Sequence, residues 1–198
     1  MDLTNNALSR LNRRLKDCFF NDETLRSFVD EGYFWSGQGF RGQLSMRAGT
    51  CFNLPEEHLL EIALFTELLH NASLVHDDIV DSDHERRGQE TVWHKYGLSK
   101  ALLVGDLLIA KAFEVASSSA IDCSIKSKWT LSLSNAVSVA VRGALCELDF
   151  KVSETDDLFS RYLSMAYDKT GVMFTLPISC VGHAARLEDA EIKKLTEV

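Results

Sequence analysis

One long apolar stretch constrains the fold of this chain more than any other feature. Its apolar and small side chains recur at helical spacings across residues 59–73, so that they lie on one stripe of a helix. Before the stretch, Asn53 is followed by Pro55 and two glutamates, which is typical of a helix start with an asparagine cap. The sequence therefore predicts an unbroken helix from about Pro55 to near Ser82.

Most of the remaining chain is also patterned as helix. Only two of its 198 residues are proline, which leaves room for long helices. No linker or repeat divides the chain, so we expect one all-α domain over residues 1–198. A loop is expected around Arg86-Arg87-Gly88. The other predicted helices are a short one ending in a left-handed cap at Gly97, then Leu98 to Ala116, Lys126 to about Phe150, a Thr155-Asp156-Asp157 cap to Lys169, and Leu187 to Val198.

Charge, cysteine content and the length of apolar runs exclude several classes of protein. Acidic residues outnumber lysine and arginine by 29 to 21, and the net charge of −8 disfavours binding to nucleic acid. The most apolar segment, 101–113, contains Asp106 and Lys111, so we expect no membrane span. The five cysteines form no CxxC pair, which indicates free thiols in a cytoplasmic protein.

The chemistry of the chain is concentrated where the long apolar helix ends. Asp77 and Asp81 are four residues apart, so they project about 40° from each other, one turn along the helix. Asp78 lies about 100° round the helix and can flank the same opening. Carboxylates this close repel one another unless a cation binds them. Mg²⁺ is the cation we expect, because it takes one or two carboxylates and keeps other positions for water and substrate phosphates.

Two arginines follow the carboxylates at a short distance. Arg86 and Arg87 precede Gly88, and the arginine guanidinium binds phosphate oxygens through two parallel hydrogen bonds. Carboxylates that hold magnesium and arginines across a loop together indicate a diphosphate site rather than a solvated charged helix end.

The chain resembles the trans-type isoprenyl (polyprenyl) diphosphate synthase family. The resemblance covers about residues 36 to 184, in the order and spacing of the family. It implies an isoprenoid-synthase-type helical bundle and, by analogy with the family, a homodimer. The matching segments are Glu67 to Asp81, Arg86-Arg87-Gly88-Gln89, Gly105 to Leu108, Lys111 to Phe113 and Lys169-Thr170-Gly171.

By resemblance, the reaction joins an allylic prenyl diphosphate to isopentenyl diphosphate. The allylic substrate loses its diphosphate, the double bond of isopentenyl diphosphate attacks the resulting cation, and a proton is lost. Carried over by position, three aspartates would ligate Mg²⁺ and serve catalysis together with a lysine. These residues are Asp77, Asp78, Asp81 and Lys169. Arg86, Lys169 and Thr170 would bind the allylic diphosphate, and His70 and Arg87 the isopentenyl diphosphate.

Two small residues bear on the length of the product. Ala72 and Ser73 precede Asp77 by five and four residues, on the helix face along which the prenyl chain would grow. In the family, bulky aromatic residues here stop elongation at fifteen carbons, so the resemblance implies a product of about twenty carbons or more. Alternatively, the small side chains only allow close helix packing.

The sequence departs from the family at two places. Without gaps, the family's lysine and arginine for isopentenyl diphosphate fall on Gly39 and Gly42, and Arg41 lies one place away as a candidate binding residue. No second aspartate-rich motif follows Lys169, because Asp156-Asp157 precedes it and is better explained as a helix cap. We therefore expect a bundle without its C-terminal helices.

These departures keep alternative functions open. The chain could belong to a family member diverted to another acceptor, or to cyclising or hydrolysing an allylic diphosphate. It could also be a binding or regulatory subunit with little catalysis of its own. The pair His76-Asp77 further admits a metal-dependent phosphohydrolase, in which His58 or His70 and Asp149 would complete the metal site.

Overall fold

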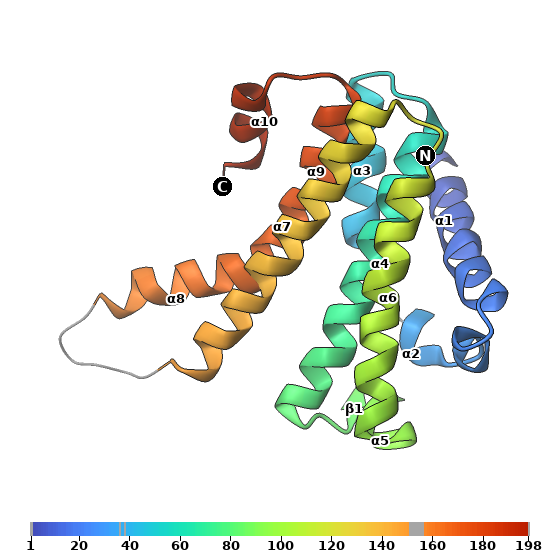
Figure 1. Cartoon of the computed structure of the whole chain (residues 1–198), viewed down its shortest axis with the longest axis vertical. Coiled ribbons are helices and arrows are strands. Elements are labelled where there is room, and N and C mark those ends of the chain that lie inside the picture. Colours follow the sequence, from blue (N-terminus) through green and yellow to red (C-terminus); the bar gives the residue numbers. More distant parts are fainter. Residues whose placement is uncertain (1, 36, 38, 151–156, 198) are drawn as a thin grey trace.

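The computed structural model describes residues 2–35, 37, 39–150 and 157–197. These residues form a bundle of α-helices with one small hairpin at one end (Figure 1). The elements are α1 (Asp2–Asn21), the 3-10 turn η1 (Leu25–Phe28), α2 (Gly32–Trp35), α3 (Phe40–Cys51), α4 (Glu56–Asp81), β1 (Glu85–Arg86), β2 (Gln89–Glu90), α5 (Val92–Tyr96), α6 (Leu98–Ser118), α7 (Cys123–Leu148), α8 (Leu158–Ala166), the π-helical turn η2 (Tyr167–Gly171), α9 (Val172–Ala184) and α10 (Asp189–Thr196).

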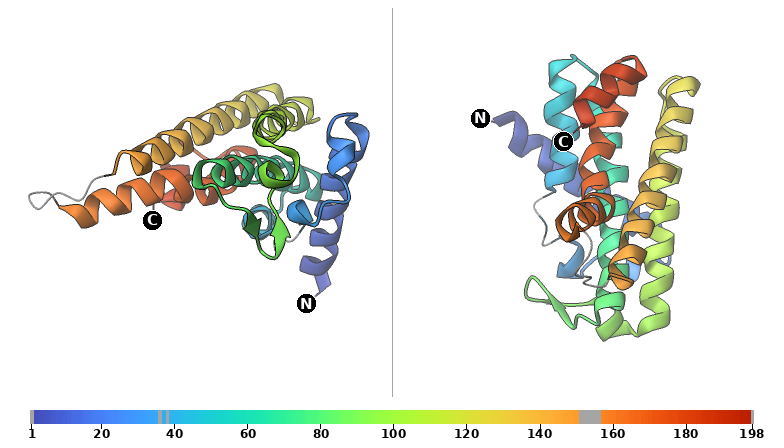
Figure 2. Two further views of the ribbon diagram at one scale, coloured as in Figure 1. Left: turned by 90° about the horizontal axis from the view of Figure 1, so that it is seen from below. Right: turned by 90° about the vertical axis from the view of Figure 1, so that its left-hand side faces the viewer.

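Helix α4 is the centre of the bundle. It packs against α1, α3, α6 and α9, and Figure 2 shows these helices around it. Every residue from Leu59 to Leu69 is buried, so this part is enclosed on all sides rather than along the one stripe that the spacing predicts. A helix with apolar residues all round belongs in the interior, where burial of its side chains supplies much of the stability.

The predicted start of α4 is correct in position but not in its cap. The helix begins at Glu56 with Pro55 as the N-cap, and no side chain caps it. Asn53 instead lies in the preceding turn with a φ of 52°, a left-handed conformation that asparagine tolerates better than most residues. At the other end, Ser82 has a φ of 57° and its N–H bonds back to the last turn, which ends the helix beside the carboxylates.

The predicted loop around Arg86 is a β-hairpin. Arg86 pairs with Gln89 across two antiparallel strands, which leaves Arg87 and Gly88 as the two-residue turn. Both turn residues have positive φ, 54° for Arg87 and 74° for Gly88, as a tight hairpin turn requires. The short helix after it ends at Gly97, whose φ is positive at 88° but whose ψ of 157° lies outside the expected left-handed helical cap.

The C-terminal part differs most from the prediction. Helix α7 begins earlier than expected, at Cys123, because the Asp122 side chain accepts the N–H of Ser124 and caps it. Asp157 caps α8 as expected, while Thr155 and Asp156 lie outside the described residues. The helix that was expected to stop at Lys169 continues through the π turn into α9, with Pro177 inside it.

Ion pairs fix the N-terminal helix to α4. Arg10 Nη1 lies 2.5 Å from Glu56 Oε1, and Arg14 Nη1 lies 2.8 Å from Glu57 Oε1.

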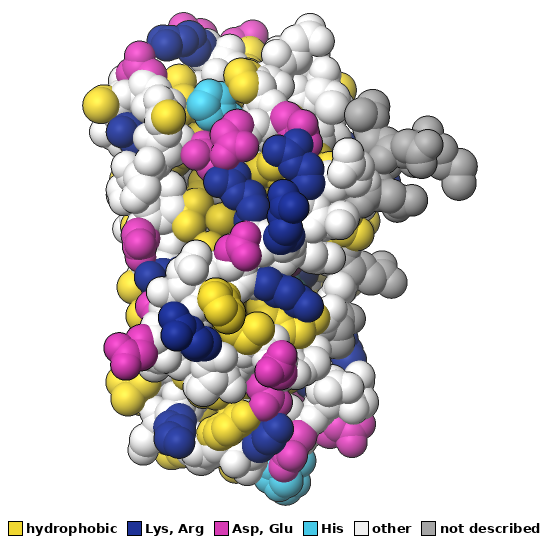
Figure 3. All heavy atoms as spheres, turned by 90° about the vertical axis from the view of Figure 1, so that its right-hand side faces the viewer, with side chains coloured by type: hydrophobic (Ala, Val, Ile, Leu, Met, Phe, Trp, Pro, Cys, Tyr) yellow, Lys and Arg dark blue, Asp and Glu magenta, His cyan; other side chains and the backbone are white. Residues whose placement is uncertain are grey.

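Figure 3 shows the face that lies to the right in Figure 1, where lysine and arginine side chains are interspersed with aspartate and glutamate. Within the described part of the chain, no helix is both long and apolar enough to cross a membrane.

Candidate functional site

The carboxylates at the end of α4 do not all point the same way. Asp77 is partly exposed, with 30% of its side chain accessible, and Asp81 is exposed beside it. Burial raises the pKa of Asp77, and the nearby negative charge of Asp81 adds to this, while Lys169 acts in the opposite direction. The predicted pairing of Asp77 with Asp81 on one helix face is therefore present.

Asp78 is held on another side of the helix. Its side chain is 1% exposed, the Tyr33 hydroxyl donates to its Oδ2 at 2.6 Å, and Arg86 Nε donates to its Oδ1 at 2.6 Å. Burial raises the pKa of Asp78, although both hydrogen bonds favour the charged carboxylate. The structure thus ties Asp78 to α2 and to the hairpin, and does not bring it to the opening that Asp77 and Asp81 share.

Lys169 brings the π turn to the carboxylates. Its Nζ donates to Glu147 Oε2 in a short hydrogen bond and lies 3.9 Å from Asp77 Oδ1. Burial alone would lower the pKa of Lys169, but the hydrogen bond to Glu147 and the charge of Asp77 raise it overall. Lys169 is therefore a cation facing two acids. Thr170 is the next residue in the turn and is exposed.

An apolar pocket of about 100 Å³ opens beneath Asp77 and Lys169. Ala72 and Ser73 lie in its wall, as the chain-length prediction requires, and α6, α7 and α9 complete it. Its other lining residues are Leu69, His76, Ile109, Val137, Ala140, Val141, Ala144 and Met173. The pocket is mostly hydrophobic, with Asp77 and Lys169 as its charged lining residues, so it suits an apolar group next to an anionic one.

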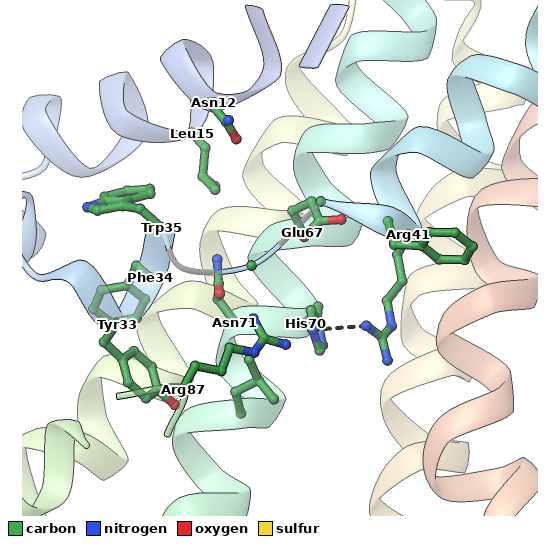
Figure 4. A pocket seen from close by; sticks show the side chains of 14 residues that line it. Asn12, Leu15, Tyr33, Phe34, Trp35, Arg41, Glu67, His70, Asn71 and Arg87 are labelled. Atoms are coloured by element: carbon green, nitrogen blue, oxygen red, sulfur yellow. Dashed lines mark hydrogen bonds between the residues drawn. The ribbon is translucent and has the colours of Figure 1, made fainter. Parts of the chain in front are cut away.

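A second, cationic cavity of about 450 Å³ lies on the other side of α4 (Figure 4). Arg41 from α3 and His70 from α4 point toward each other, with Arg41 Nη1 3.0 Å from His70 Nε2, and Arg87 reaches in from the hairpin. Burial lowers the pKa of His70 to about 3, and the neighbouring arginines contribute, so the imidazole is neutral at pH 7. Because Arg41 can only donate, Nε2 accepts and Nδ1 carries the hydrogen.

Two donors in this cavity have no partner within the described structure. They are Arg41 Nε and His70 Nδ1, both buried. A buried donor left unpaired is unfavourable, so each of these groups would gain from an acceptor within its reach. Burial lowers the pKa of the Arg41 guanidinium, and the Phe174 ring lies 4.4 Å from it. Arg41 thus reaches the cavity despite its displaced position in the sequence.

The two glycines at the family's cationic positions have packing roles. Gly42 donates its N–H to Glu67 Oε1 at 2.7 Å, and a Cβ there would lie 2.8 Å from a Leu11 methyl group. Gly39 is the N-cap of α3 and has a φ of 58°, a conformation that glycine adopts without strain. Ser36 and Gln38, from the same segment, lie outside the described residues.

The donor set at Asp77 and Asp81 fits a magnesium ion. The described residues contain no ready-made group of three histidine, cysteine or acidic side chains that could hold a metal ion. Magnesium needs fewer protein ligands than this, because water and phosphate oxygens complete its six positions. Two accessible carboxylates one helical turn apart, beside an apolar pocket, satisfy that requirement.

Comparison with known proteins decides the family. Residues 22–198 match the model of a family described as polyprenyl synthetase. The chain belongs to this family. The resemblance to the trans-type isoprenyl diphosphate synthases is thereby confirmed, and the family membership argues against a phosphohydrolase built on His76 and Asp77.

The polyprenyl synthetase relatives differ in product. The chain is 32% identical over 195 residues to the short chain isoprenyl diphosphate synthase of Methanocaldococcus jannaschii, covering 97% of this chain and 58% of the relative. It is 29% identical over 198 residues to the geranylgeranyl diphosphate synthase of Saccharolobus solfataricus, covering 99% and 58%. The octaprenyl diphosphate synthase of Escherichia coli is 30% identical over 168 residues, covering 83% and 50%. The chain thus spans under three fifths of their length.

Solved structures share the fold. An FPP/GFPP synthase from Zymomonas mobilis superposes with a TM-score of 0.86 at 24% identity, covering 98% of this chain and 73% of the other. A geranylgeranyl pyrophosphate synthetase from Geoglobus acetivorans gives 0.88 at 24%, covering 98% and 64%. These likenesses confirm the expected all-α isoprenoid-synthase bundle, of which the chain forms a part.

One residue of the site escaped the sequence analysis. Tyr33 lies 45 positions before Asp78, in a four-residue helix without a motif of its own. Its only sequence signal is its place in an aromatic segment with Phe34 and Trp35. The other site residues that the sequence predicts lie around the end of α4. They either line the apolar pocket or the cationic cavity, or lie between these two.

Proposed function

We propose that this protein condenses an allylic prenyl diphosphate with isopentenyl diphosphate. The observation that carries the proposal is the apolar pocket that opens directly beneath Asp77 and Lys169, with the cationic cavity of Arg41, His70 and Arg87 across α4. One site suits a hydrocarbon chain with an anionic head, and the other suits a second anion. The names of the relatives support the same class of reaction.

In this proposal the allylic diphosphate binds over the apolar pocket. Magnesium held by Asp77 and Asp81 would neutralise charge on the diphosphate as it leaves. Lys169 adds positive charge there, and the charge of Arg86 also acts on Asp77. Thr170 is exposed at the same turn as Lys169 and is a further hydrogen-bond donor. The apolar wall excludes water from the allylic cation that remains when the diphosphate departs with its electron pair. We assign Asp78 to holding Arg86 rather than to the metal, because both of its oxygens accept other hydrogen bonds.

Isopentenyl diphosphate would occupy the cationic cavity. Arg41 Nε and His70 Nδ1 supply the two unpartnered donors, and Arg87 supplies a guanidinium. The double bond would attack the allylic cation from this side, forming the new carbon–carbon bond before a proton is lost to the released diphosphate.

We propose a product of about twenty carbons or more, which the small side chains in the pocket wall support. Ala72 and Ser73 add little bulk to it, so a growing chain could pass between α4 and the helices opposite. The relatives' products range from short chains to octaprenyl, and family membership alone therefore leaves the length open.

We further propose that the protein is a cytoplasmic homodimer. Leucines on α6 and α7 are exposed, among them Leu103 at 65% and Leu131 at 71%, and a second copy could cover them. All five cysteines are free, as in a reducing compartment. Sedimentation of the full chain tests the dimer, because a monomer at micromolar concentration would contradict it.

Magnesium-dependent binding of inorganic diphosphate tests the site. By calorimetry, Asp77→Asn and Asp81→Asn should each weaken binding at least tenfold, because each removes a charged ligand. Asp189→Asn is the matched control, since this aspartate is 88% exposed on α10. Undiminished binding by both site variants would show that the metal assignment is wrong.

A labelled substrate tests the reaction itself. The full chain is incubated with magnesium and farnesyl diphosphate, with and without isopentenyl diphosphate. Longer product only when both are present supports the proposal. Turnover without isopentenyl diphosphate would indicate a family member diverted to another reaction. This is the second candidate, because Gly39 and Gly42 stand where the family has cationic residues for isopentenyl diphosphate. Diphosphate binding without turnover would indicate a binding or regulatory subunit.

A further inference from the structure

The last turn of α4 is attached to its neighbours on two opposite sides. On one side Asp78 is bonded to Tyr33 and Arg86. On the other side His76 Nε2 lies 3.2 Å from the carbonyl oxygen of Leu102 in α6 and 3.6 Å from Asp106 Oδ1. A carbonyl oxygen only accepts, so Nε2 of His76 carries the hydrogen and donates it.

Gly105 provides the place in which the His76 ring sits. A Cβ at this position would overlap the imidazole, with the Nε2, Cδ2 and Cε1 atoms all in the way. Gly105 is buried in the interior of α6, where glycine is unfavourable for helix formation. Its presence there is explained by the close approach of the imidazole to the α6 backbone.

The direction of each side chain follows from helix geometry. Each residue turns the helix by about 100°, so His76 and Asp78 point about 200° apart. Asp77 lies about 100° from His76 and Asp81 about 140° from it. Both therefore point between the two attached sides, and Asp77 lines the apolar pocket together with His76.

We propose that His76, seated on Gly105, is a positioning residue that fixes the rotation of the last turn of α4 and so aims Asp77 and Asp81 at the diphosphate site. This inference rests on the proposed function of those two carboxylates. His76 acts through the helix and touches neither the metal nor the diphosphate.

A double-mutant cycle on the full chain tests the pair. The variants are His76→Ala, Gly105→Ala and both together, measured by calorimetry with inorganic diphosphate and saturating magnesium. Each single change should weaken binding about tenfold. The double variant should bind no more weakly than His76→Ala, because the added methyl group then meets no imidazole. Ser99→Ala, an exposed change in α6, is the control. Unchanged binding by Gly105→Ala, or losses that multiply in the double variant, would overturn the proposal.

Two further substitutions of His76 distinguish a role that needs its hydrogen bond from a role that only fills space. In His76→Gln an amide N–H can reach the Leu102 carbonyl, whereas His76→Leu fills similar space without a donor. We expect the glutamine variant to bind within about threefold of wild type and the leucine variant about tenfold more weakly. Equal binding by these two variants would contradict the proposed role.

The unfolding midpoint in urea distinguishes the two possible failures. If wild-type protein shows no magnesium-dependent diphosphate binding, the proposed function has failed. The double-mutant cycle of His76 and Gly105 is then evaluated from the urea midpoints of the variants instead of from their diphosphate binding. If Gly105→Ala lowers the midpoint on the wild-type background but not on the His76→Ala background, the contact between His76 and Gly105 holds without a ligand. Equal shifts on both backgrounds would overturn it.

Discussion

The Tyr33 hydroxyl donates a 2.6 Å hydrogen bond to Asp78, and this contact joins the N-terminal segment to the end of the central helix. The acceptor side chain is 1% exposed and also holds Arg86. A hydrogen bond to a buried charged group contributes more to stability than one between neutral groups. The orientation of the arginine hairpin thus depends on a residue far away in the sequence.

Tyr33→Phe should therefore destabilise the protein. We expect a loss of about 1.5–3 kcal/mol in the free energy of unfolding, because the Asp78 carboxylate stays buried with one partner fewer. Urea denaturation at pH 7 measures it. Tyr162→Phe removes a hydroxyl from a side chain on α8 that is 53% exposed and should change stability by under about 0.5 kcal/mol. Equal small effects of both variants would contradict the role of Tyr33.

The contrast between Tyr33 and Asp77 shows what the sequence can reveal. Asp77 and Asp81 share a face because of helix periodicity, a local rule that is readable from spacing alone. The bond from Tyr33 to Asp78 joins elements 45 residues apart, and no local pattern encodes it. Helix geometry also explains why Asp78 is separate from Asp77 and Asp81. Its offset of about 100° from Asp77 turns the Asp78 side chain toward Tyr33, and not toward the opening that Asp77 and Asp81 share.

The π turn around Lys169 was hidden for a similar reason. The segment after residue 157 has helical spacing, which predicts a helix but not the extra residue that a π turn inserts. The family motif indicated Lys169, and tertiary packing of its backbone against Gly143 places it beside Asp77. Likewise, the sequence predicts a loop around Arg86-Arg87-Gly88 but not the two-residue hairpin turn, because a non-glycine residue with positive φ, as at Arg87, is uncommon.

Enlarging Ser73 should shorten the space for a prenyl chain. Ser73→Phe would fill much of the pocket of about 100 Å³ beneath Asp77. Wild-type protein should bind farnesyl diphosphate more tightly than inorganic diphosphate, and the variant should lose that difference while it binds inorganic diphosphate as before. Calorimetry with both ligands measures this. Ser73→Ala, which keeps the pocket open, is the control and should behave as wild type.

Arg87 should show opposite effects on stability and binding. Its φ of 54° is unfavourable for a residue with a Cβ, and asparagine tolerates this conformation better. Arg87→Asn should thus raise the free energy of unfolding by about 0.5 kcal/mol or more. It should weaken diphosphate binding roughly tenfold or more, because a charged hydrogen bond is lost. Arg47→Asn, on the exposed side of α3, should leave binding unchanged. A lower free energy of unfolding in Arg87→Asn would show that the positive φ does not strain the backbone at Arg87.

His70 should make stability depend on pH. Its pKa is about 3 in the folded protein and about 6.5 when unfolded, so between these values the unfolded chain binds more protons. Stability from this group is complete above pH 6.5 and falls by about 1.4 kcal/mol per unit as the pH drops toward 3.

The comparison with His70→Asn isolates this contribution from that of the carboxylates. Between pH 7 and pH 5, wild type should lose about 2 kcal/mol more of its unfolding free energy than the variant. Denaturation in urea at the two values measures it. His84→Asn, at an exposed histidine beside the hairpin, should follow wild type. Parallel losses in wild type and His70→Asn would show that the buried imidazole does not stay neutral.

Two helical glycines test how tightly the π turn is packed. A Cβ at Gly143 in α7 would overlap the backbone of Asp168 and Lys169, and two backbones cannot move apart without disturbing the site. Gly143→Ala should therefore destabilise the protein by about 1–3 kcal/mol and weaken magnesium-dependent diphosphate binding. At Gly182 in α9, the same Cβ would lie 2.7 Å from Cγ1 of Ile192, so a side chain rather than a backbone would have to shift. Gly182→Ala should therefore destabilise the protein less than Gly143→Ala, because alanine also favours the helix, and it should leave diphosphate binding unchanged. If urea denaturation gave both variants the same stability, backbone contact at Gly143 would not be what fixes Lys169 beside Asp77.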